Sequence, residues 1–310
     1  MLSYLQAIVI GLTQGITELF PVSSLGHSVL IPALIGGSWQ PLVTQSATAD
    51  SGSSFYLAFI VALHVATATA LLLFFRKDWV RIISGFFRSL KPSIAARRIV
   101  AEDDDSRLAW LIVIATIPVG LTGVALEHTF RTLFAKPLAV AIFLTINGVL
   151  LLVGERLRRT SEVAVAKTGS PSGATEVQER GTRSILSLSY KEALGVGCFQ
   201  IAALFAGISR SGAAMVGGLV RGLSHEDAAR FSFLLATPVI FAAGVLKLPS
   251  LAGPSAAHIH GQILVGVIVA FIGAYLSIAF LVKYFETRTL TPFAIYSLVF
   301  GIFCIVRFSV

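Results

Sequence analysis

Charged residues are scarce in this chain of 310 residues, and their scarcity excludes an ordinary soluble domain. Asp, Glu, Lys and Arg make up 13% of the sequence, and hydrophobic residues make up 55%. Soluble proteins carry roughly 25% charged residues, so this chain cannot cover its surface with charge. With a mean hydropathy of +0.83, the composition predicts a protein that uses lipid as part of its solvent.

Other absences narrow the class further. The chain has two cysteines, Cys198 and Cys304, in apolar stretches without a CxxC pair or a histidine at metal spacing, so we expect two small buried side chains. No GxxxxGK[ST] motif occurs, which argues against an ATP-driven pump. The apolar N-terminus lacks a basic region and a small-residue cleavage site, and Glu18 interrupts it, so we expect it to stay in the mature protein.

What is present is a set of long apolar segments. Two regions, 2–36 and 190–222, are broken near the middle by glycine, serine and titratable groups, which membrane depth tolerates only where protein or a water-filled cavity surrounds the break. We therefore predict an all-α polytopic membrane protein with six transmembrane helices and two re-entrant helix–loop–helix hairpins. The six stretches long enough to span, at about 20 residues each, are 55–75, 108–126, 137–154, 228–248, 259–282 and 290–306.

Basic residues set the orientation of these spans. The loops 76–107 and 155–191 hold eight and seven Lys or Arg residues, whereas 37–54 and 249–258 hold none. By the positive-inside rule the basic loops are expected in the cytoplasm, and both termini outside it. The stretch 160–184 is rich in Ser, Thr, Gly and Glu, which predicts a flexible linker.

The two broken hairpins are related by an internal repeat. A shift of 186 positions aligns, without a gap, Gly11 with Gly197, Gln14 with Gln200, Ser23 with Ser209 and Gly26 with Gly212. Each copy is a hairpin followed by three spans, and because three is odd the second copy must be inverted. We divide the chain into a first repeat, 1–154, a linker, 155–189, and a second repeat, 190–310. Inverted repeats with broken helices place a site where the halves meet, so the 14–27 and 207–212 loops are expected to face each other.

The first of these loops concentrates polar groups in apolar surroundings. A carboxylate at mid-membrane, Glu18, costs roughly 2.5–3.5 kcal/mol on insertion scales and marks a functional-site hypothesis. Gln14 lies four residues earlier and shares a helix face with it. His27 follows Ser24 by three residues, so it can serve as general acid or base for a hydroxyl nucleophile. Alternatively, Ser23 caps the following helix and His27 only packs.

The second loop offers the groups that bind phosphate: a guanidinium, two hydroxyls and backbone amides freed by glycine. They belong to Gly207, Ser209, Arg210, Ser211 and Gly212. Alternatively, Arg210 is a structural partner of Glu18, and the two interpretations are compatible in the resting protein. His64, in the span 55–75, either faces the site or is a hydrogen-bonded core histidine.

With these segments the chain resembles the undecaprenyl-diphosphatase family, also called the bacitracin-resistance protein family. The resemblance covers nearly the whole chain and rests on GLTQGITELFPVSSLGH, on GISRSG followed by GLSHEDAARFSFLLATPV, and on FIVALHVATATALLLFFRKDW. It implies hydrolysis of a C55 polyprenyl diphosphate to the monophosphate in the bacterial plasma (inner) membrane. This reaction recycles the lipid carrier of cell-wall synthesis and has bacitracin resistance as a consequence.

The resemblance also implies roles for individual residues. Glu18 and Gln14 match the acidic motif, Ser24 and His27 the catalytic pair, and Arg210 the phosphate-binding arginine. The nucleophile stays open between Ser24, His27 and an activated water. A divalent cation, Mg²⁺ or Ca²⁺, is expected on Glu18 and the substrate phosphates, because a glutamine stands at position 14 where many members have glutamate. Substrate-binding residues are expected to be Gln14, Ser23, Gly207, Ser209, Ser211 and Gly212.

Two further matters stay open at the level of sequence. A transporter or lipid flippase would use the same inverted repeats and buried charges, and movement of intact lipid without hydrolysis would identify it. Expected partners are the polyprenyl diphosphate and membrane lipids but no nucleic acid, and the choice between a monomer and a homodimer is undecided.

Overall fold

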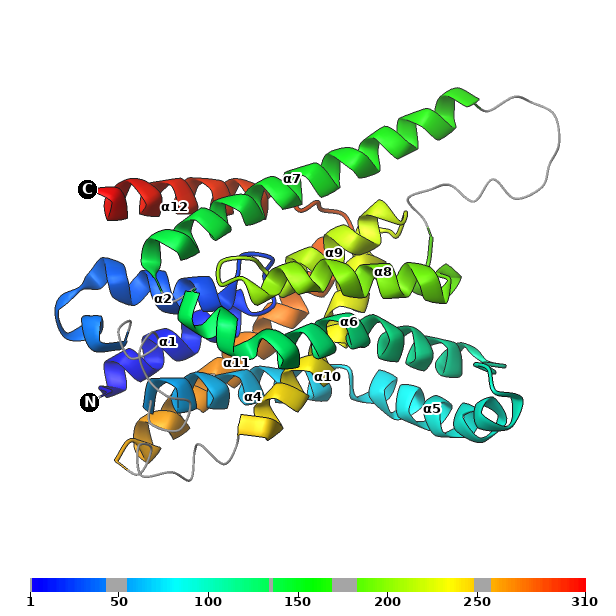
Figure 1. The fold of residues 1–310 in the computed structure, drawn as a ribbon, viewed down its shortest axis with the longest axis horizontal. Helices are drawn as coiled ribbons and strands as arrows, with labels where there is room; N and C mark the ends of the chain where they lie inside the picture. Colours follow the sequence, from blue (N-terminus) through cyan, green and yellow to red (C-terminus); the bar gives the residue numbers. More distant parts are fainter. Residues whose placement is uncertain (1, 43–54, 134–135, 169–182, 248–257) are drawn as a thin grey trace.

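All regular elements of the described chain are helices. The computed structural model describes residues 2–42, 55–133, 136–168, 183–247 and 258–310 (Figure 1). Within this part no strand forms, and the only β-type pairing is an isolated bridge between Arg183 and Leu223. The predicted all-α class is therefore confirmed.

Long apolar helices account for most of the molecule. In chain order the elements are α1 (Tyr4–Thr17), α2 (Ser24–Ile35), η1 (Gly37–Trp39), α4 (Phe55–Phe74), α5 (Arg76–Ala96), α6 (Asp104–Leu133), α7 (Pro137–Thr168), η2 (Ile185–Ser187), α8 (Tyr190–Ile201), η3 (Ala202–Leu204), α9 (Arg210–Val220), α10 (His225–Lys247), α11 (His260–Phe285) and α12 (Thr291–Ser309). In the described residues, five helices are long and apolar enough to cross a membrane: α6, α7, α10, α11 and α12. The pair α4 and α5, bent by 85°, passes the same test together.

Two segments expected to be loops contain helix instead. The predicted loop 76–107 holds the 21-residue helix α5. Helix α7 continues to Thr168, so the prediction of a flexible linker is wrong for 160–168, and residues 169–182 lie outside the described part. The reason is visible in the sequence, because the helix-stopping residues Gly169 and Pro171 come only after α7 ends.

The prediction of two buried cysteines is half wrong, since Cys304 is buried but Cys198, on α8, is exposed. A helix surrounded by lipid needs no polar outer face. An apolar sequence therefore does not distinguish the side that packs against protein from the side that faces lipid.

Both broken regions fold as helix–loop–helix hairpins, and their helices begin alike. Ser3 and Ser189 cap α1 and α8, each with a reciprocal capping box. Ser23 and Ser209 cap α2 and α9, and each hydroxyl accepts the amide of the residue three positions later, at 3.3 and 3.2 Å. Each pair of serines is separated by 186 positions, so the weak sequence repeat corresponds to a repeated local structure.

Helix packing crosses between the two halves. Helix α1 packs along α11 and α8 along α6, while α4 packs on α10 and α7 on α12. Small residues permit the close approach: a Cβ added to Gly11 would stand 2.6 Å from the carbonyl oxygen of Gly266, and one added to Gly197 would clash with the carbonyl oxygen of Ala115. Each half thus completes the other.

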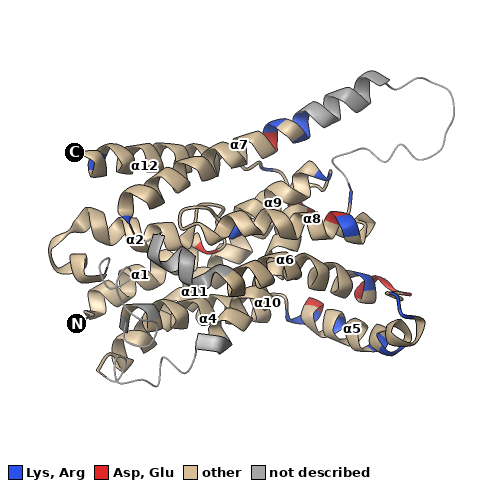
Figure 2. Cartoon of the chain, in the orientation of Figure 1, with Lys and Arg blue, Asp and Glu red and all other residues tan. Residues whose placement is uncertain are grey.

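Most charged segments of the described chain gather at one end of this bundle (Figure 2). Figure 2 shows blue and red segments gathered on α5, the start of α6, the later turns of α7 and the start of α8, while the helix middles are almost entirely uncharged. Both chain ends lie at the opposite end of the molecule (Figure 1). The loops between α1 and α2 and between α8 and α9 are thus set inside an apolar bundle.

Candidate active site

The loops of the two hairpins meet, as the repeat predicts. Arg210 Nη2 donates to Glu18 Oε1 at 2.8 Å. The hydroxyl of Ser211 donates to the carbonyl of Phe20 at 3.3 Å. A charged contact and a backbone contact therefore join segments almost 200 residues apart in sequence.

Asn147, which lies within α7, holds both loops at once. Its Nδ2 donates to the carbonyl of Pro21 at 3.0 Å, and its Oδ1 accepts the amide of Ser209 at 2.9 Å. The side chain is buried, with 1% exposure. The loop motifs do not point to Asn147, although an amide in the middle of an apolar span is a signal that could have found it.

Glu18 is the centre of the polar cluster. The residue is 8% exposed, directly after the last turn of α1. Its Oε2 accepts Gln14 Nε2 at 2.9 Å and Ser24 Oγ at 2.5 Å, and His64 Nε2 lies 3.5 Å from the same oxygen. With Arg210 on Oε1, the carboxylate has four polar neighbours, which stabilise a buried charge that would be costly alone.

The local sequence explains why these groups converge. Gln14 and Glu18 are one helical turn apart, so the amide meets the carboxylate as predicted. Ser24 is the first residue of α2, and its hydroxyl points back to the end of α1. Between them Ser23 has a φ of +69°, a backbone region that side chains other than glycine rarely adopt. Such strain is typical of functional loops.

Arg210 is only half satisfied. Its Nη2 is held by Glu18, while its Nη1 is buried and, within the described residues, has no hydrogen-bond partner. Buried donors are normally paired, so the free half of the guanidinium is a place for an anion. Both interpretations of Arg210 thus hold in the resting protein: it is a partner of Glu18 and it retains a donor for phosphate.

His27 is not paired with Ser24, contrary to our expectation. Its Nδ1 lies 2.7 Å from the carbonyl of Ser23, and its Nε2 lies 2.7 Å from the hydroxyl of Tyr296. Because a carbonyl only accepts, Nδ1 carries the proton and Nε2 of the neutral ring accepts from Tyr296. The rings of Tyr296 and Phe300 stack on the imidazole, with centroids 5.7 and 5.3 Å away. The sequence gives no local signal for Tyr296, which is 269 positions away.

His64 faces the site. Its Nδ1 lies 2.8 Å from the carbonyl of Ile60, one turn earlier in α4, and its Nε2 points to Glu18. The side chain is 27% exposed. Of the two interpretations that the sequence left open for His64, the structure supports the functional one.

The remaining predicted substrate-binding residues pack the second loop against α7 and against the first loop. A Cβ on Gly207, whose φ is +113°, would stand 2.5 Å from the carbonyl oxygen of Val140. Ser209 caps α9, and its hydroxyl lies 2.9 Å from that of Ser211. Gly212 packs against Pro21, since an added Cβ would stand 3.2 Å from the proline Cβ. Their contact with substrate remains a prediction.

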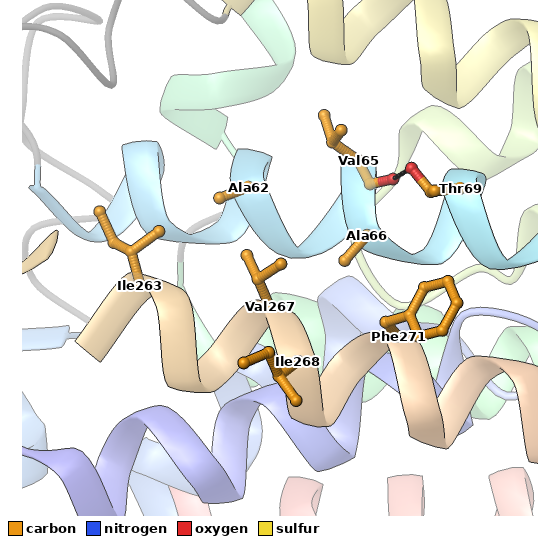
Figure 3. A pocket seen from close by; sticks show the side chains of 8 residues that line it. All are labelled: Ala62, Val65, Ala66, Thr69, Ile263, Val267, Ile268 and Phe271. Carbon is orange, nitrogen blue, oxygen red and sulfur yellow. Dashed lines mark hydrogen bonds between the residues drawn. The ribbon is translucent and has the colours of Figure 1, made fainter. Parts of the chain in front are cut away.

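A separate hollow lies between α4 and α11 (Figure 3). It has a volume of about 400 Å³, and its walls are apolar side chains such as Val65, Ala66, Val267 and Phe271. The hydroxyl of Thr69 in its wall donates to the carbonyl of Val65. The hollow offers contact to hydrocarbon but contains none of the polar groups around Glu18.

Comparison with known proteins places the chain in a family. The model of the family described as bacitracin resistance protein BacA matches residues 7–303. The chain is 59% identical to "Undecaprenyl-diphosphatase 2" of Frankia alni, over 100% of this chain and 99% of that protein. It is 55% identical to "Undecaprenyl-diphosphatase" of Mycolicibacterium paratuberculosis, over 97% and 95%. It is 42% identical to "Undecaprenyl-diphosphatase 2" of Burkholderia orbicola, over 96% and 94%. This chain is a multi-pass membrane protein that belongs to the bacitracin resistance protein BacA family.

Proposed function

We propose that this protein is an undecaprenyl-diphosphatase, which hydrolyses the C55 polyprenyl diphosphate to the monophosphate and phosphate. Relatives named for this activity match the chain over its full length. One structural observation carries the proposal: a serine hydroxyl 2.5 Å from a buried carboxylate lies beside a half-satisfied arginine. The activity recycles the lipid carrier of cell-wall synthesis, and bacitracin resistance follows from it.

The diphosphate is expected to bind where the two hairpins meet. Arg210 Nη1 offers a buried donor. Ser24 and Arg210 are the first residues of α2 and α9, so two helix N-termini, which favour anions, lie at the same site. The prenyl tail needs only apolar helix faces and can remain among the lipids.

In the reaction, Ser24 Oγ attacks the terminal phosphorus while its proton passes to Glu18 Oε2, the nearest acceptor. The bond from phosphorus to the bridging oxygen breaks, and the prenyl monophosphate leaves with its negative charge stabilised by Arg210. A water molecule then attacks the phosphoserine and loses one proton to solvent. The bond from phosphorus to Ser24 Oγ breaks, Oγ takes back the proton held by Glu18, and phosphate is released. His27 would carry a proton in this cycle only after Nε2 leaves Tyr296. Attack by His27 or by water remains the alternative that trapping would reveal.

Glu18 and Gln14 fit a divalent cation, for which we propose Mg²⁺ or Ca²⁺. Gln14 Oε1 is buried and has no hydrogen-bond partner among the described residues, and such ions are commonly held by one or two carboxylates together with substrate phosphates. Glu18, Gln14 and the diphosphate would hold the ion, which supplies neutralisation of phosphate charge.

We also propose the finer topology: six spans and two re-entrant hairpins in an inverted repeat with the boundaries 1–154, 155–189 and 190–310. The matched serine caps and the exchanged packing of the halves support it. The charged end seen in Figure 2 would be cytoplasmic. Both termini, which lie at the opposite end (Figure 1), would be outside the cytoplasm of a bacterial plasma membrane. Phosphate would then be released outside.

The direct test is phosphate release from C55 polyprenyl diphosphate by the purified protein in detergent, with and without a chelator. We expect release by the wild type, inhibition by the chelator and recovery on adding Mg²⁺ or Ca²⁺. Movement of intact lipid across proteoliposomes without any phosphate release would contradict the proposal and identify a carrier.

A further inference from the structure

Three polar groups surround one oxygen of Glu18, and one of them is an imidazole. Around Oε2 lie Gln14 Nε2 at 2.9 Å, Ser24 Oγ at 2.5 Å and His64 Nε2 at 3.5 Å. The hydroxyl and the amide have hydrogens to donate to this oxygen. His64 presents a different kind of atom.

The backbone fixes which nitrogen of His64 faces Glu18 and what that nitrogen carries. Nδ1 lies 2.8 Å from the carbonyl of Ile60 and must donate to it. In the neutral ring, Nε2 then has a lone pair, and it points at a carboxylate oxygen that also has only lone pairs. Two acceptors 3.5 Å apart gain nothing from each other, whereas a proton on Nε2 or a metal ion between the two atoms would satisfy both. A ring whose other N–H donates to a backbone carbonyl is the usual arrangement of a metal-binding histidine.

Gln14 supplies a second observation that points to a cation. The residue has 0% exposure, and its Oε1 has no hydrogen-bond partner in the described part of the chain. A half-turn of its amide group exchanges Nε2 for Oε1 at Glu18 and turns a donor into an oxygen ligand. The amide oxygen of Gln14 and Nε2 of His64 would then both lie beside Glu18 Oε2, which makes two oxygens and one nitrogen in all.

The separations suit a single ion. Neighbouring ligand atoms of an octahedral ion with bonds of about 2.1 Å lie about 3 Å apart, close to the 2.9 and 3.5 Å measured from Glu18 Oε2. Among the described residues no three His, Cys, Asp or Glu side chains form a metal-binding group. The third ligand atom here is an amide oxygen, which lies outside those four residue types.

We propose that His64 is a nitrogen ligand in the cation site of Glu18 and Gln14, and that the site therefore prefers a divalent transition ion such as Mn²⁺ to Ca²⁺. This inference rests on the proposed function, since the diphosphate supplies the remaining ligands. Imidazole favours transition ions, whereas Ca²⁺ takes oxygen ligands almost exclusively. Histidine thus supplies the third protein ligand without adding a second negative charge.

The test uses Mn²⁺ with methylenediphosphonate, a diphosphate that is not hydrolysed, and the full-length protein without a histidine tag. Pulsed electron paramagnetic resonance detects a nitrogen bound to Mn²⁺ through its nuclear modulation. We expect histidine ¹⁴N modulation in the wild type, replaced by the ¹⁵N pattern after labelling with [¹⁵N]histidine. The variant His64→Gln should lose the modulation and bind Mn²⁺ on the order of tenfold more weakly, with a smaller change in Ca²⁺ affinity.

His27→Gln is the matched control, because the Nε2 of His27 is already occupied by Tyr296; the modulation should persist in it. Bound Mn²⁺ without nitrogen modulation in the wild type, modulation that survives His64→Gln, or no saturable Mn²⁺ binding would each overturn the inference. The wild-type spectra need no variant, so misfolding of His64→Gln would not obscure the answer. Phosphate release measured on the same preparations separates the two proposals. Release without a nitrogen signal would support the phosphatase and contradict the His64 ligand. A nitrogen signal without release would support the His64 ligand and contradict the phosphatase.

Discussion

The loop of the first hairpin and the loop of the second are built alike but carry opposite chemistry. Each loop follows a helix whose N-terminus is capped by a serine. Each loop also ends at a second serine, whose hydroxyl caps the next helix by accepting the amide three residues later. The residue after that second cap is Ser24 in the first loop and Arg210 in the second, 186 positions apart. One position in a repeated frame thus holds the proposed nucleophile in one copy and the proposed anion-binding group in the other.

The carboxylate belongs to one copy only. The position 186 residues after Glu18 is Leu204, which lies in η3. The backbone differs as well, since Ser23 has a φ of +69° and Ser209 an extended φ of −81°. The strained copy is the one that positions the hydroxyl and the acid. The repeat thus provides two helix N-termini at one site, and the proposed reaction depends on Glu18 and Ser24, which only the first copy has.

Among substitutions in the two loops, replacing Ser24 should lower activity the most. Ser24→Ala removes the proposed nucleophile, and kcat for phosphate release should fall by at least about 10³-fold. The matched control is Ser28→Ala, one turn further along α2, whose hydroxyl is buried without a hydrogen-bond partner in the described structure; it should keep its activity. Near-normal turnover of Ser24→Ala would exclude the serine mechanism.

Glu18→Gln should follow, with a loss of about 10²–10³-fold in kcat, because the proton acceptor for Ser24 disappears. Its control is Glu192→Gln at the charged end of the molecule, where a hydrogen bond from Arg183 lowers the pKa of Glu192 to about 2. Both carboxylates are paired with an arginine and accept a serine hydroxyl, but the hydroxyl on Glu18 is that of Ser24 and the one on Glu192 is that of Ser189. Equal losses in the two variants would show that an ion pair, and not the site, limits activity.

Loss of Glu18 also leaves Arg210 buried without its partner, a change that costs about 3–5 kcal/mol in soluble proteins. Thermal unfolding of Glu18→Gln should therefore be measured beside its kinetics. Glu18→Asp keeps the charge but shortens the reach to Ser24. It should regain stability more fully than activity.

Arg210→Lys tests the second loop. A lysine keeps the charge but loses the planar pair of donors, so KM for the diphosphate should rise by about tenfold with a smaller change in kcat. Arg230→Lys, in a residue paired with Asp78 at the charged end, is expected to change neither constant. A fall in kcat with an unchanged KM in Arg210→Lys would show that Arg210 acts in the chemical step and not in substrate binding.

Tyr296→Phe should have the smallest effect. It removes the hydroxyl on His27 Nε2 and keeps the stacked ring. If His27 only supports the start of α2, kcat should change by less than about fivefold, in keeping with a hydrogen bond of about 1 kcal/mol. Tyr284→Phe, whose hydroxyl donates to Thr289 at 3.3 Å, is the control. A loss of 100-fold or more would show that the bond between Tyr296 and His27 is part of the reaction.

Local sequence patterns predicted the long apolar helices and part of the candidate site. Apolar length located the five helices that are long and apolar enough to span, and the four-residue spacing of Gln14 and Glu18 predicted their contact. The serine–glycine repeat predicted that the two loops meet. These predictions succeeded because each depends on neighbours in sequence or on a repeat that aligns without a gap.

Contacts made by helices distant in sequence could not be predicted from local patterns. Asn147, His64 and Tyr296 reach the site from α7, α4 and α12, and nothing near them in sequence states their partners. The expected pairing of Ser24 with His27 followed helix spacing alone. This pairing does not form, because the hydroxyl of Ser24 bonds to Glu18 and Nε2 of His27 bonds to Tyr296.

The central claim is that Ser24 forms a covalent bond to phosphorus in a site completed by the second loop. Rapid quenching of the enzyme during turnover, in acid to preserve phosphoserine and in alkali to preserve acid-labile phosphohistidine, followed by peptide mass spectrometry, tests it most directly. We expect a phosphate on Ser24 in the wild type, none in Ser24→Ala, and a reduced amount in Arg210→Lys at limiting substrate. Full turnover with no phosphate on Ser24 at any time, or phosphate found on His27, would contradict it.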